Sequence, residues 1–234
     1  SGDSYFSPDM ELYDGAGALV TSGGQITRRL ATAGPYMALL YDGFYGTLKG
    51  SYQIQLLTVT NPCQAVTTLV CGQSLSNSIS AAAEIDTYVL PDVGVGSFIS
   101  LRATKTSGDG YFSPTMELYD GAGALVASGG QITRRLTTDG PYMALLRDGF
   151  NYRLVGGYQI QLLTVTNPCQ PTVTLACGQS LSNSISAAAE IDTYVLPDVG
   201  VGSFISLRAT KTSGDTYFSP DMELYDGAGA LVAS

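Results

Sequence analysis

The chemistry open to this chain is limited first by the residue types it lacks. It contains no histidine and no tryptophan among 234 residues. A Ser-His-Asp triad, a Cys-His pair and a histidine-ligated metal are therefore excluded. The groups that remain for chemistry are four cysteines, paired carboxylates and loop acids that could gather around a cation.

The cysteines form the best-defined motif. Cys63 and Cys71 recur as Cys169 and Cys177, with seven residues between the members of each pair. The spacing is not that of a CxxC metal site, and an even number of cysteines in a secreted β-domain is typical of disulfides. We expect all four to be oxidised.

Two disulfide pairings are open. A Cys63–Cys71 bond, repeated as Cys169–Cys177, would clamp the linker between consecutive domains. A Cys71–Cys169 bond would instead tie together the two ends of one domain. We favour the clamp, because a tandem fibre usually places the two ends of a domain far apart.

Paired carboxylates are the residual candidates for acid–base catalysis. Glu84 and Asp86 stand two residues apart at a strand start, and Glu117 and Asp120 flank a turn. Solvated strand ends and turn chemistry account for both pairs. We expect Asp86 to fix a local backbone turn and its neighbour Tyr88 to pack.

Calcium is the alternative role for the acids. The loop carboxylates are Asp92, Asp109, Asp120 and Asp148, and hard cations bind clustered oxygens. The chain has no Asp-x-Asp-x-Asp loop. The sequence therefore predicts no catalytic residue, no cofactor and no resident metal, with bound calcium as the minor alternative.

Two kinds of side chain are candidates for contacts between domains. Arg28 and Arg29 recur as Arg134 and Arg135 and point to opposite faces of one expected strand. We expect solvated edge charges, with an ion pair to a neighbouring domain or chain as the alternative. We expect the tyrosines to pack in the core and at interfaces rather than to form a sugar-binding platform. Examples are Tyr111, Tyr119, Tyr142 and Tyr158.

These residues belong to a long internal repeat. The sequence SGDSYFSPDMELYDGAGALV at residue 1 returns almost unchanged at residues 107 and 213, which gives a period of 106 (107 − 1 and 213 − 107). Residues 1–106 and 107–212 differ at 15 positions, so about 86% are identical. A period of this length is a whole domain rather than a solenoid unit.

The repeat implies domain boundaries. We expect a complete central domain at 69–168, the C-terminal part of a first repeat at 1–62, and the N-terminal part of a third at 175–234. The linkers are then 63–71 and 169–177. Differences between copies cluster at 31–33, 41–51 and 65–70, which suits loops and linkers.

Each repeat has the pattern of an all-β domain. Short alternating segments are separated by Gly, Pro, Asp or Ser, and none has a convincing helical period. The expected strands of the central copy are 74–81, 85–90, 97–104, 116–119, 124–127, 131–136, 142–146 and 158–165. Eight antiparallel strands in about 100 residues predict a jelly-roll-like β-sandwich.

The order of motifs resembles one known family, the bacterial pre-peptidase C-terminal (PPC) domain. The residues that carry this resemblance are Gly72-Gln-Ser-Leu-Ser-Asn-Ser-Ile, Ile85-Asp-Thr-Tyr, Met116-Glu-Leu-Tyr-Asp-Gly-Ala-Gly, Gly140-Pro-Tyr-Met and Gly157-Tyr-Gln-Ile-Gln-Leu. The resemblance covers the whole repeat. It implies a secreted β-sandwich that accompanies exported hydrolases or repeats in surface proteins, without catalysis of its own.

The net charge and the hydropathy of the chain limit the classes of partner that we expect. The net charge is -9, and an acidic surface repels the phosphates of nucleic acids. No apolar run approaches the roughly 18 residues of a membrane span. We therefore expect a non-enzymatic, extracellular or cell-surface repeat that self-associates with identical repeats or chains in a filament, stalk or fibre. The alternative is an adhesin or a substrate-binding accessory module of a secreted hydrolase.

Overall fold

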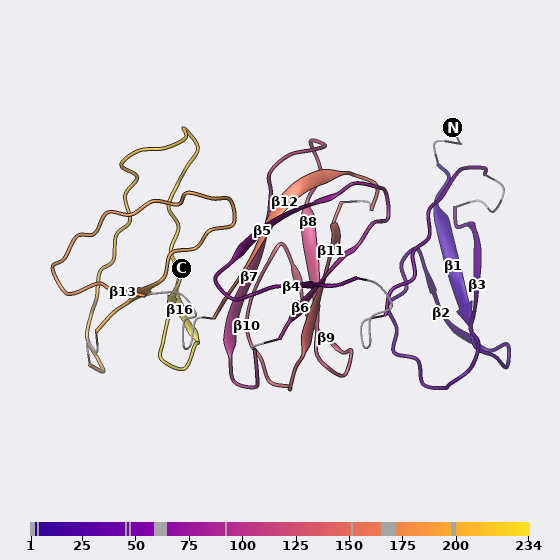
Figure 1. Cartoon of the computed structure of the whole chain (residues 1–234), viewed down its shortest axis with the longest axis horizontal. Coiled ribbons are helices and arrows are strands. Elements are labelled where there is room, and N and C mark those ends of the chain that lie inside the picture. Colours follow the sequence, from indigo (N-terminus) through magenta and orange to yellow (C-terminus); the bar gives the residue numbers. More distant parts are fainter. Residues whose placement is uncertain are drawn as a thin grey trace. The chain divides into compact units, whose positions relative to one another are not determined.

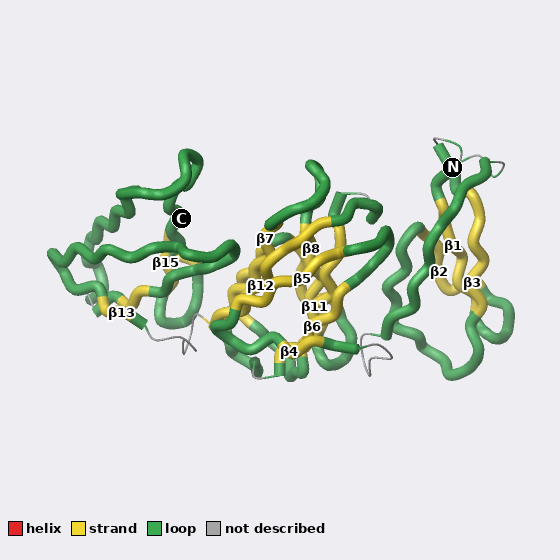
Figure 2. The backbone as a smooth tube through the Cα atoms, turned by 45° about the horizontal axis from the view of Figure 1, so that its top comes forward, coloured by secondary structure: helices red, strands yellow, loops and turns green. Residues whose placement is uncertain are grey.

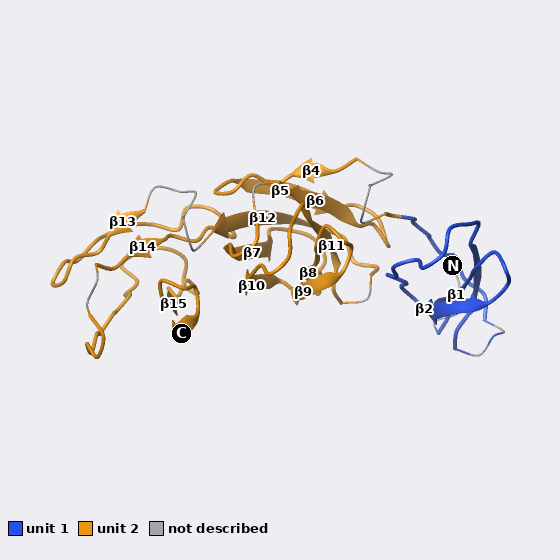
Figure 3. Cartoon of the chain, turned by 90° about the horizontal axis from the view of Figure 1, so that it is seen from below, with its two compact units in different colours: residues 1–56 blue, residues 57–234 orange. Residues whose placement is uncertain are grey.

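The computed structural model of the chain describes residues 3, 5–44, 46, 48–58, 65–91, 93–150, 152–164, 172–197 and 200–234. It divides into two compact units, residues 1–56 and 57–234 (Figure 3). Across these described ranges the structure contains strands and loops and no helix (Figure 2). The predicted all-β class is confirmed.

The central repeat holds most of the strand structure (Figure 1). All eight predicted strands are present, with ends that differ by a few residues, and a two-residue strand precedes them. The nine strands are β4 (Thr67–Thr68), β5 (Ser74–Ile79), β6 (Asp86–Leu90), β7 (Phe98–Lys105), β8 (Pro114–Tyr119), β9 (Leu125–Gly129), β10 (Gln131–Arg135), β11 (Tyr142–Asp148) and β12 (Gly156–Thr164).

Two sheets build the sandwich. One has the strand order β10-β7-β12-β5 and the other β4-β6-β11-β8-β9. Apart from the parallel β4–β6 pair, the neighbours in both sheets are antiparallel. Strand β5 pairs with β12, β6 with β11, β7 with β10 and β8 with β9, so early strands pair with late ones in a nested order. This nested order is the jelly-roll arrangement.

The core lies between the sheets because alternate residues of each strand point inward. Ile99 and Leu101 of β7 meet Ile160 and Leu162 of β12 on one inner face, and all four are buried. The facing sheet contributes buried residues from β6, β8 and β11, namely Tyr88, Leu90, Met116, Leu118, Tyr142, Ala144 and Leu146. The alternating pattern predicted for these strands therefore places one face of each strand in the core.

The other two copies contain fewer strands. Residues 1–56 form one sheet of order β2-β1-β3, from β1 (Pro8–Tyr13), β2 (Leu19–Gly23) and β3 (Met37–Asp42). This order repeats β9-β8-β11 of the central sandwich. The described part of 172–234 holds two small pairs, from β13 (Val173–Thr174), β14 (Tyr194–Val195), β15 (Leu224–Tyr225) and β16 (Leu231–Ala233).

One hairpin turn is the same in all three copies. After β8, the Asp120 N–H donates to the Ala124 carbonyl at 3.0 Å, and Gly123 has a φ of 77°. A positive φ of this size is easily adopted only by glycine. The counterparts Gly17 and Gly229 have φ values of 83° and 79°. The predicted Asp-Gly turn is therefore formed by its local sequence in every copy.

Candidate functional site

Four polar side chains meet between the two sheets of the central repeat. Asp86 and Tyr88 come from β6 in one sheet, while Asn77 of β5 and Tyr158 of β12 come from the other. Asn77 and Tyr158 stand opposite each other in the β5–β12 register. Strand alternation puts Asp86 and Tyr88 on the same face as Leu90; Tyr88 is buried and Asp86 is half-buried.

The hydrogen bonds of this sheet-spanning network have a defined direction. The Tyr158 hydroxyl donates to Asp86 Oδ2, so its oxygen accepts from the Tyr88 hydroxyl at 2.6 Å. Asn77 Nδ2 lies 3.2 Å from Asp86 Oδ2 and 3.3 Å from the Tyr88 oxygen, and donates to both. The network thereby satisfies its buried hydroxyls and links both sheets.

Burial sets the protonation of this network. Burial raises the pKa of Tyr158, and its hydrogen bonds to Asp86 and Tyr88 raise that pKa further. Burial also raises the pKa of Tyr88. Burial raises the pKa of Asp86, although its hydrogen bond from Tyr158 opposes the change. Both tyrosines therefore remain protonated donors over the physiological range.

The solvent exposure of its hydroxyl groups limits the chemistry that the network can perform. Tyr158 and Tyr88 are 0% and 1% exposed, so their hydroxyl groups are closed to a substrate in solution. The network joins the two sheets through these buried hydroxyl groups, while Asp86 is half-buried and Asn77 is exposed. The expectation that Asp86 fixes a local turn is corrected, because its carboxylate accepts from Tyr158 and Asn77 instead.

The loop acids bind backbone. Asp148 accepts from the N–H groups of Ser113, Phe150 and Leu154 at 3.4, 3.2 and 3.2 Å. Asp120 holds its turn through the N–H groups of Ala122 and Ala124, and Asp109 accepts from Val155. Asp92 lies outside the described residues. Among the described residues, no group of three or more acids or cysteines is placed to hold a metal ion.

The two carboxylate pairs are also engaged in local structure. Glu84 accepts from the N–H groups of Ser80 and Ala81 at 2.7 and 2.8 Å, which closes the turn before β6. Glu117 forms an ion pair with Arg147 at 2.7 Å and accepts from the Tyr119 hydroxyl at 2.8 Å. Neither pair brings two carboxylates together around an open site.

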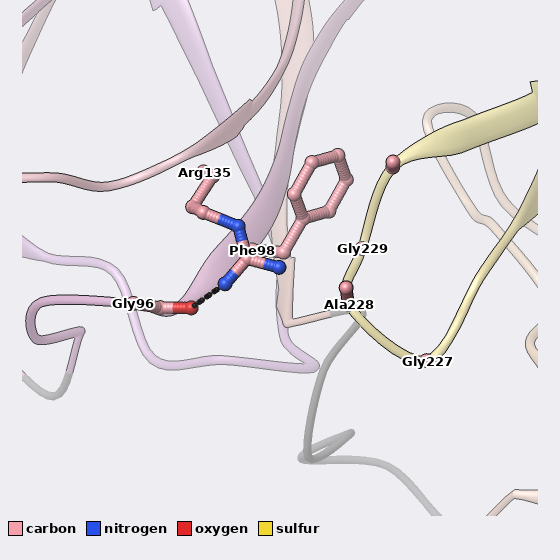
Figure 4. Close-up of a pocket in the computed structure, with 7 residues that line it drawn as sticks. Gly96, Phe98, Arg135, Gly227, Ala228 and Gly229 are labelled. Carbon is pink, nitrogen blue, oxygen red and sulfur yellow. Dashed lines mark hydrogen bonds between the residues drawn. The ribbon is translucent and has the colours of Figure 1, made fainter.

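The predicted arginine pair lies on the edge strand β10. Arg134 is exposed, and Arg135 donates from Nη1 to the Gly96 carbonyl at 3.0 Å. Arg135 borders an open pocket that is lined by Gly96, Phe98 and the turn 227–230, with no carboxylate among its lining residues (Figure 4). Arg28 and Arg29 are exposed in their own unit. Arg134 and Arg135 are thus exposed charges on an edge strand, whereas Arg28 and Arg29 are exposed outside any strand.

The tyrosines named from the sequence divide into two groups. Tyr119, Tyr142 and Tyr158 are buried, as expected for packing residues. Tyr111 is 75% exposed and stacks on Phe150, with ring centroids 5.5 Å apart. The same exposed pair occurs in the first copy, where Tyr5 stacks on Phe44 at 5.9 Å.

The cysteines differ between copies. Cys71 is disulfide-bonded, and its Sγ lies 3.6 Å from Thr164 Oγ1 near the end of β12. Cys177, its counterpart one period later, is exposed and free, which disagrees with the predicted Cys169–Cys177 bond. Cys63 and Cys169 lie outside the described residues, and the pairing of Cys71 stays a prediction.

Sequence reasoning missed the sheet-spanning network, although one signal for it was present. Period-2 alternation places Asp86 on the same face of its strand as Tyr88 and Leu90, and a partly buried acid requires hydrogen-bond donors. The identity of those donors, Asn77 and Tyr158, depends on which strands become neighbours. Their separations from Asp86 are 9 and 72 residues.

Comparison with known proteins adds no family assignment. No protein-family model matches the chain, and no curated protein matches it. The resemblance to the PPC domain therefore stays a prediction. In the part of the chain that the structure describes, no helix has the length and apolar character needed to cross a membrane.

Proposed function

We propose that the chain is a structural array of β-sandwich repeats that builds a long extracellular filament, stalk or surface fibre, and that it has no enzymatic role. One observation carries the proposal: the candidate polar groups of the central repeat are engaged in holding the sandwich together. Asp148 and Asp120 bind backbone, and Asp86 joins the sheets through Tyr158. This use of polar groups suits a module that holds its shape.

The pattern of identity between copies supports the same role. Residues 72–106 and 178–212 are identical, and they include the segment that forms β5, β6 and β7 in the central repeat. Differences fall mainly in loops and near the repeat junctions. Repetition of one nearly unchanged module adds length and identical surfaces, whereas new binding specificity would require divergent loops.

An extracellular location and self-association belong to this proposal. The disulfide at Cys71 suits an oxidising compartment, and the net charge of -9 disfavours nucleic acid as a partner. The resemblance to secreted PPC domains supports the same location. The partners proposed are identical repeats or further copies of this chain.

The test is immunogold electron microscopy of the producing cells, with antibodies raised against the purified chain. We expect label along extended fibres or stalks outside the cell. Pre-absorption of the antibody with the chain serves as the control and should remove the label. Label confined to the cell interior, or spread evenly with no fibre beneath it, would reject the proposal.

The exposed aromatic pairs favour a second candidate, a sugar-binding adhesin or accessory module. Tyr111 and Phe150 stack on the surface of the central repeat, and Tyr5 and Phe44 repeat them one period earlier. Both rings of the central pair are mostly exposed. Exposed aromatic faces can stack on the apolar face of a sugar ring, so a repeated pair could act multivalently.

This candidate is tested by binding of the chain to a panel of polysaccharides, measured by affinity electrophoresis and calorimetry. Loss of binding in a Tyr111→Ala/Phe150→Ala variant would support it. Val95→Ala changes another exposed side chain and is the matched control. Binding that is absent, or equal in all three proteins, would count against an aromatic platform.

A further inference from the structure

Three strands of the central repeat are buried on both of their faces. The consecutive residues 142–146 of β11, 160–163 of β12 and 98–101 of β7 are all buried. In an antiparallel sandwich, alternate residues of a strand face the core and the others point to the outer face of the sheet. Each sheet of the central repeat therefore has an outer face that is covered over part of its area.

The outer face of the sheet β4-β6-β11-β8-β9 carries a small apolar cluster that is separate from the main core. Tyr119 of β8 and both Met143 and Leu145 of β11 are buried there. Leu57 and Ile85 pack against these three side chains. Leu57 belongs to the preceding repeat, so one residue of that repeat contacts the outer face of β8 and β11.

The outer face of the other sheet is covered from the following repeat. Phe98 of β7 and Leu163 of β12 are buried on this face, and Leu163 is the counterpart of Leu57 one period later. The ring of Tyr225 lies 5.0 Å from the ring of Phe98, tilted by 56°. The Tyr225 hydroxyl reaches Thr133 of the neighbouring strand β10.

The turn that follows Tyr225 approaches the same face closely. A Cβ atom placed on Gly229 would lie 2.9 Å from Cγ of Phe98, which is too close for any side chain (Figure 4). The hairpin from Leu224 to Ala233 that carries this turn is closed by its own hydrogen bond, from the Asp226 N–H to the Ala230 carbonyl at 2.9 Å. A formed hairpin thus rests directly on β7.

The tyrosine of this contact is positioned in the same way in every copy. Its hydroxyl donates to the glutamate two residues earlier, which lies on the same face of the strand. This bond holds the ring over the outer face rather than the core. The three bonds are Tyr13–Glu11 at 2.7 Å, Tyr119–Glu117 at 2.8 Å and Tyr225–Glu223 at 2.6 Å.

We propose that the outer face of β8 and β11 in one repeat packs on the outer face of β7 and β12 in the repeat before it, so that consecutive repeats stack sheet against sheet. Two contacts carry this inference. Leu57, a β12-type residue, packs on the cluster of Tyr119, and Tyr225, the counterpart of Tyr119, packs on Phe98. The same two faces therefore meet before and after the central repeat. The inference rests on the proposed structural role and names the neighbouring repeat as the partner.

The first experiment uses tryptophan as a reporter, because the chain contains none. Phe98→Trp should emit at short wavelength and be poorly quenched by acrylamide, and adding Tyr225→Ala should raise the quenching constant several-fold. Tyr111→Ala, which removes another aromatic ring that is mostly exposed, is the matched second change and should leave the quenching constant unchanged. If Phe98→Trp does not fold by circular dichroism, Tyr225→Trp with and without Phe98→Ala gives the same reading. An unshielded tryptophan, or one that Tyr225→Ala does not expose, would overturn the proposal.

The second experiment tests the opposite face. Met143→Trp should also be shielded, and Leu57→Asp should raise its quenching constant several-fold, whereas Leu125→Asp changes an exposed leucine and should not. Equal quenching in all three proteins would overturn stacking at this face. Both experiments report contact between repeats whether or not the chain forms fibres. Shielding without fibres on the producing cells would reject the filament and keep the stacking, and fibres without shielding would do the reverse.

Discussion

Identical sequence forms different structure in two regions of this molecule. Residues 98–105 form the central strand β7, whereas the same eight residues at 204–211 form no strand. In the first region the segment lies between β10 and β12; in the second, no strand among the described residues pairs with it. The comparison shows that this β-strand is stabilised by the strands beside it and the sheet above it rather than by its own residues.

The most direct test of this comparison replaces the same leucine side chain by alanine in both copies of the segment. Leu101→Ala should lower the free energy of unfolding of the central repeat by about 2–5 kcal/mol, because it leaves a cavity in a closed core. Leu207→Ala should change that free energy by less than about 0.5 kcal/mol. Urea unfolding followed by circular dichroism measures both. Equal losses would mean that residues 204–211 are also packed in solution.

The cysteines extend the comparison to covalent structure. Cys71 is bonded in the complete repeat, and Cys177 is free in the incomplete one. A Cys71–Cys169 bond agrees with this difference, since it bonds Cys71 and leaves Cys177 unpaired. The linker clamp favoured by the sequence would bond Cys177 as well.

Cys71→Ser should therefore destabilise the central repeat by about 2–4 kcal/mol, because the unfolded chain loses a long covalent loop. Cys177→Ser is the matched control and should have little effect. Peptide mapping under non-reducing conditions checks the pairing directly. A Cys63–Cys71 peptide would reject the Cys71–Cys169 bond and restore the clamp.

The sheet-spanning network allows a third comparison of equivalent residues. Tyr158→Phe removes the hydroxyl that joins Asp86 to Tyr88, and it should cost about 1–3 kcal/mol in the urea unfolding of the central repeat. Tyr52→Phe removes the same hydroxyl from an exposed side chain and should be nearly neutral for that transition. A neutral Tyr158→Phe would show that the network does not stabilise the sandwich.

The smallest expected effect is on pH dependence. The folded pKa of Tyr158 lies above its ordinary value of about 10, so the folded state retains a proton that the unfolded state loses in alkali. The stabilisation from this group is complete below pH 10 and is lost progressively above it. One pH unit higher, the free energy of unfolding is lower by about 1 kcal/mol for each such tyrosine. The free energy of unfolding, measured at a series of alkaline pH values, should fall less steeply with pH in Tyr158→Phe. An unchanged slope would contradict the raised pKa.

Much of the fold followed from local pattern. Period-2 alternation located the eight strands of the central repeat. The Asp-Gly turn forms in all three copies because its glycine adopts a positive φ and its Asp side chain binds backbone N–H groups within five residues. Burial of Tyr142 and Tyr158 agrees with the packing role that we expected for the tyrosines. These features need only near neighbours in the chain.

The sequence by itself determined the period of 106 residues, the all-β class, the absence of histidine chemistry and the hairpin turns, since each depends on residue type and short-range spacing. Only the tertiary structure decided which strands become neighbours. That pairing turned Asp86 from an expected turn residue into a bridge to Tyr158, 72 residues away. It also placed β7 between β10 and β12, because a strand requires partners for its backbone hydrogen bonds and cover for its apolar face.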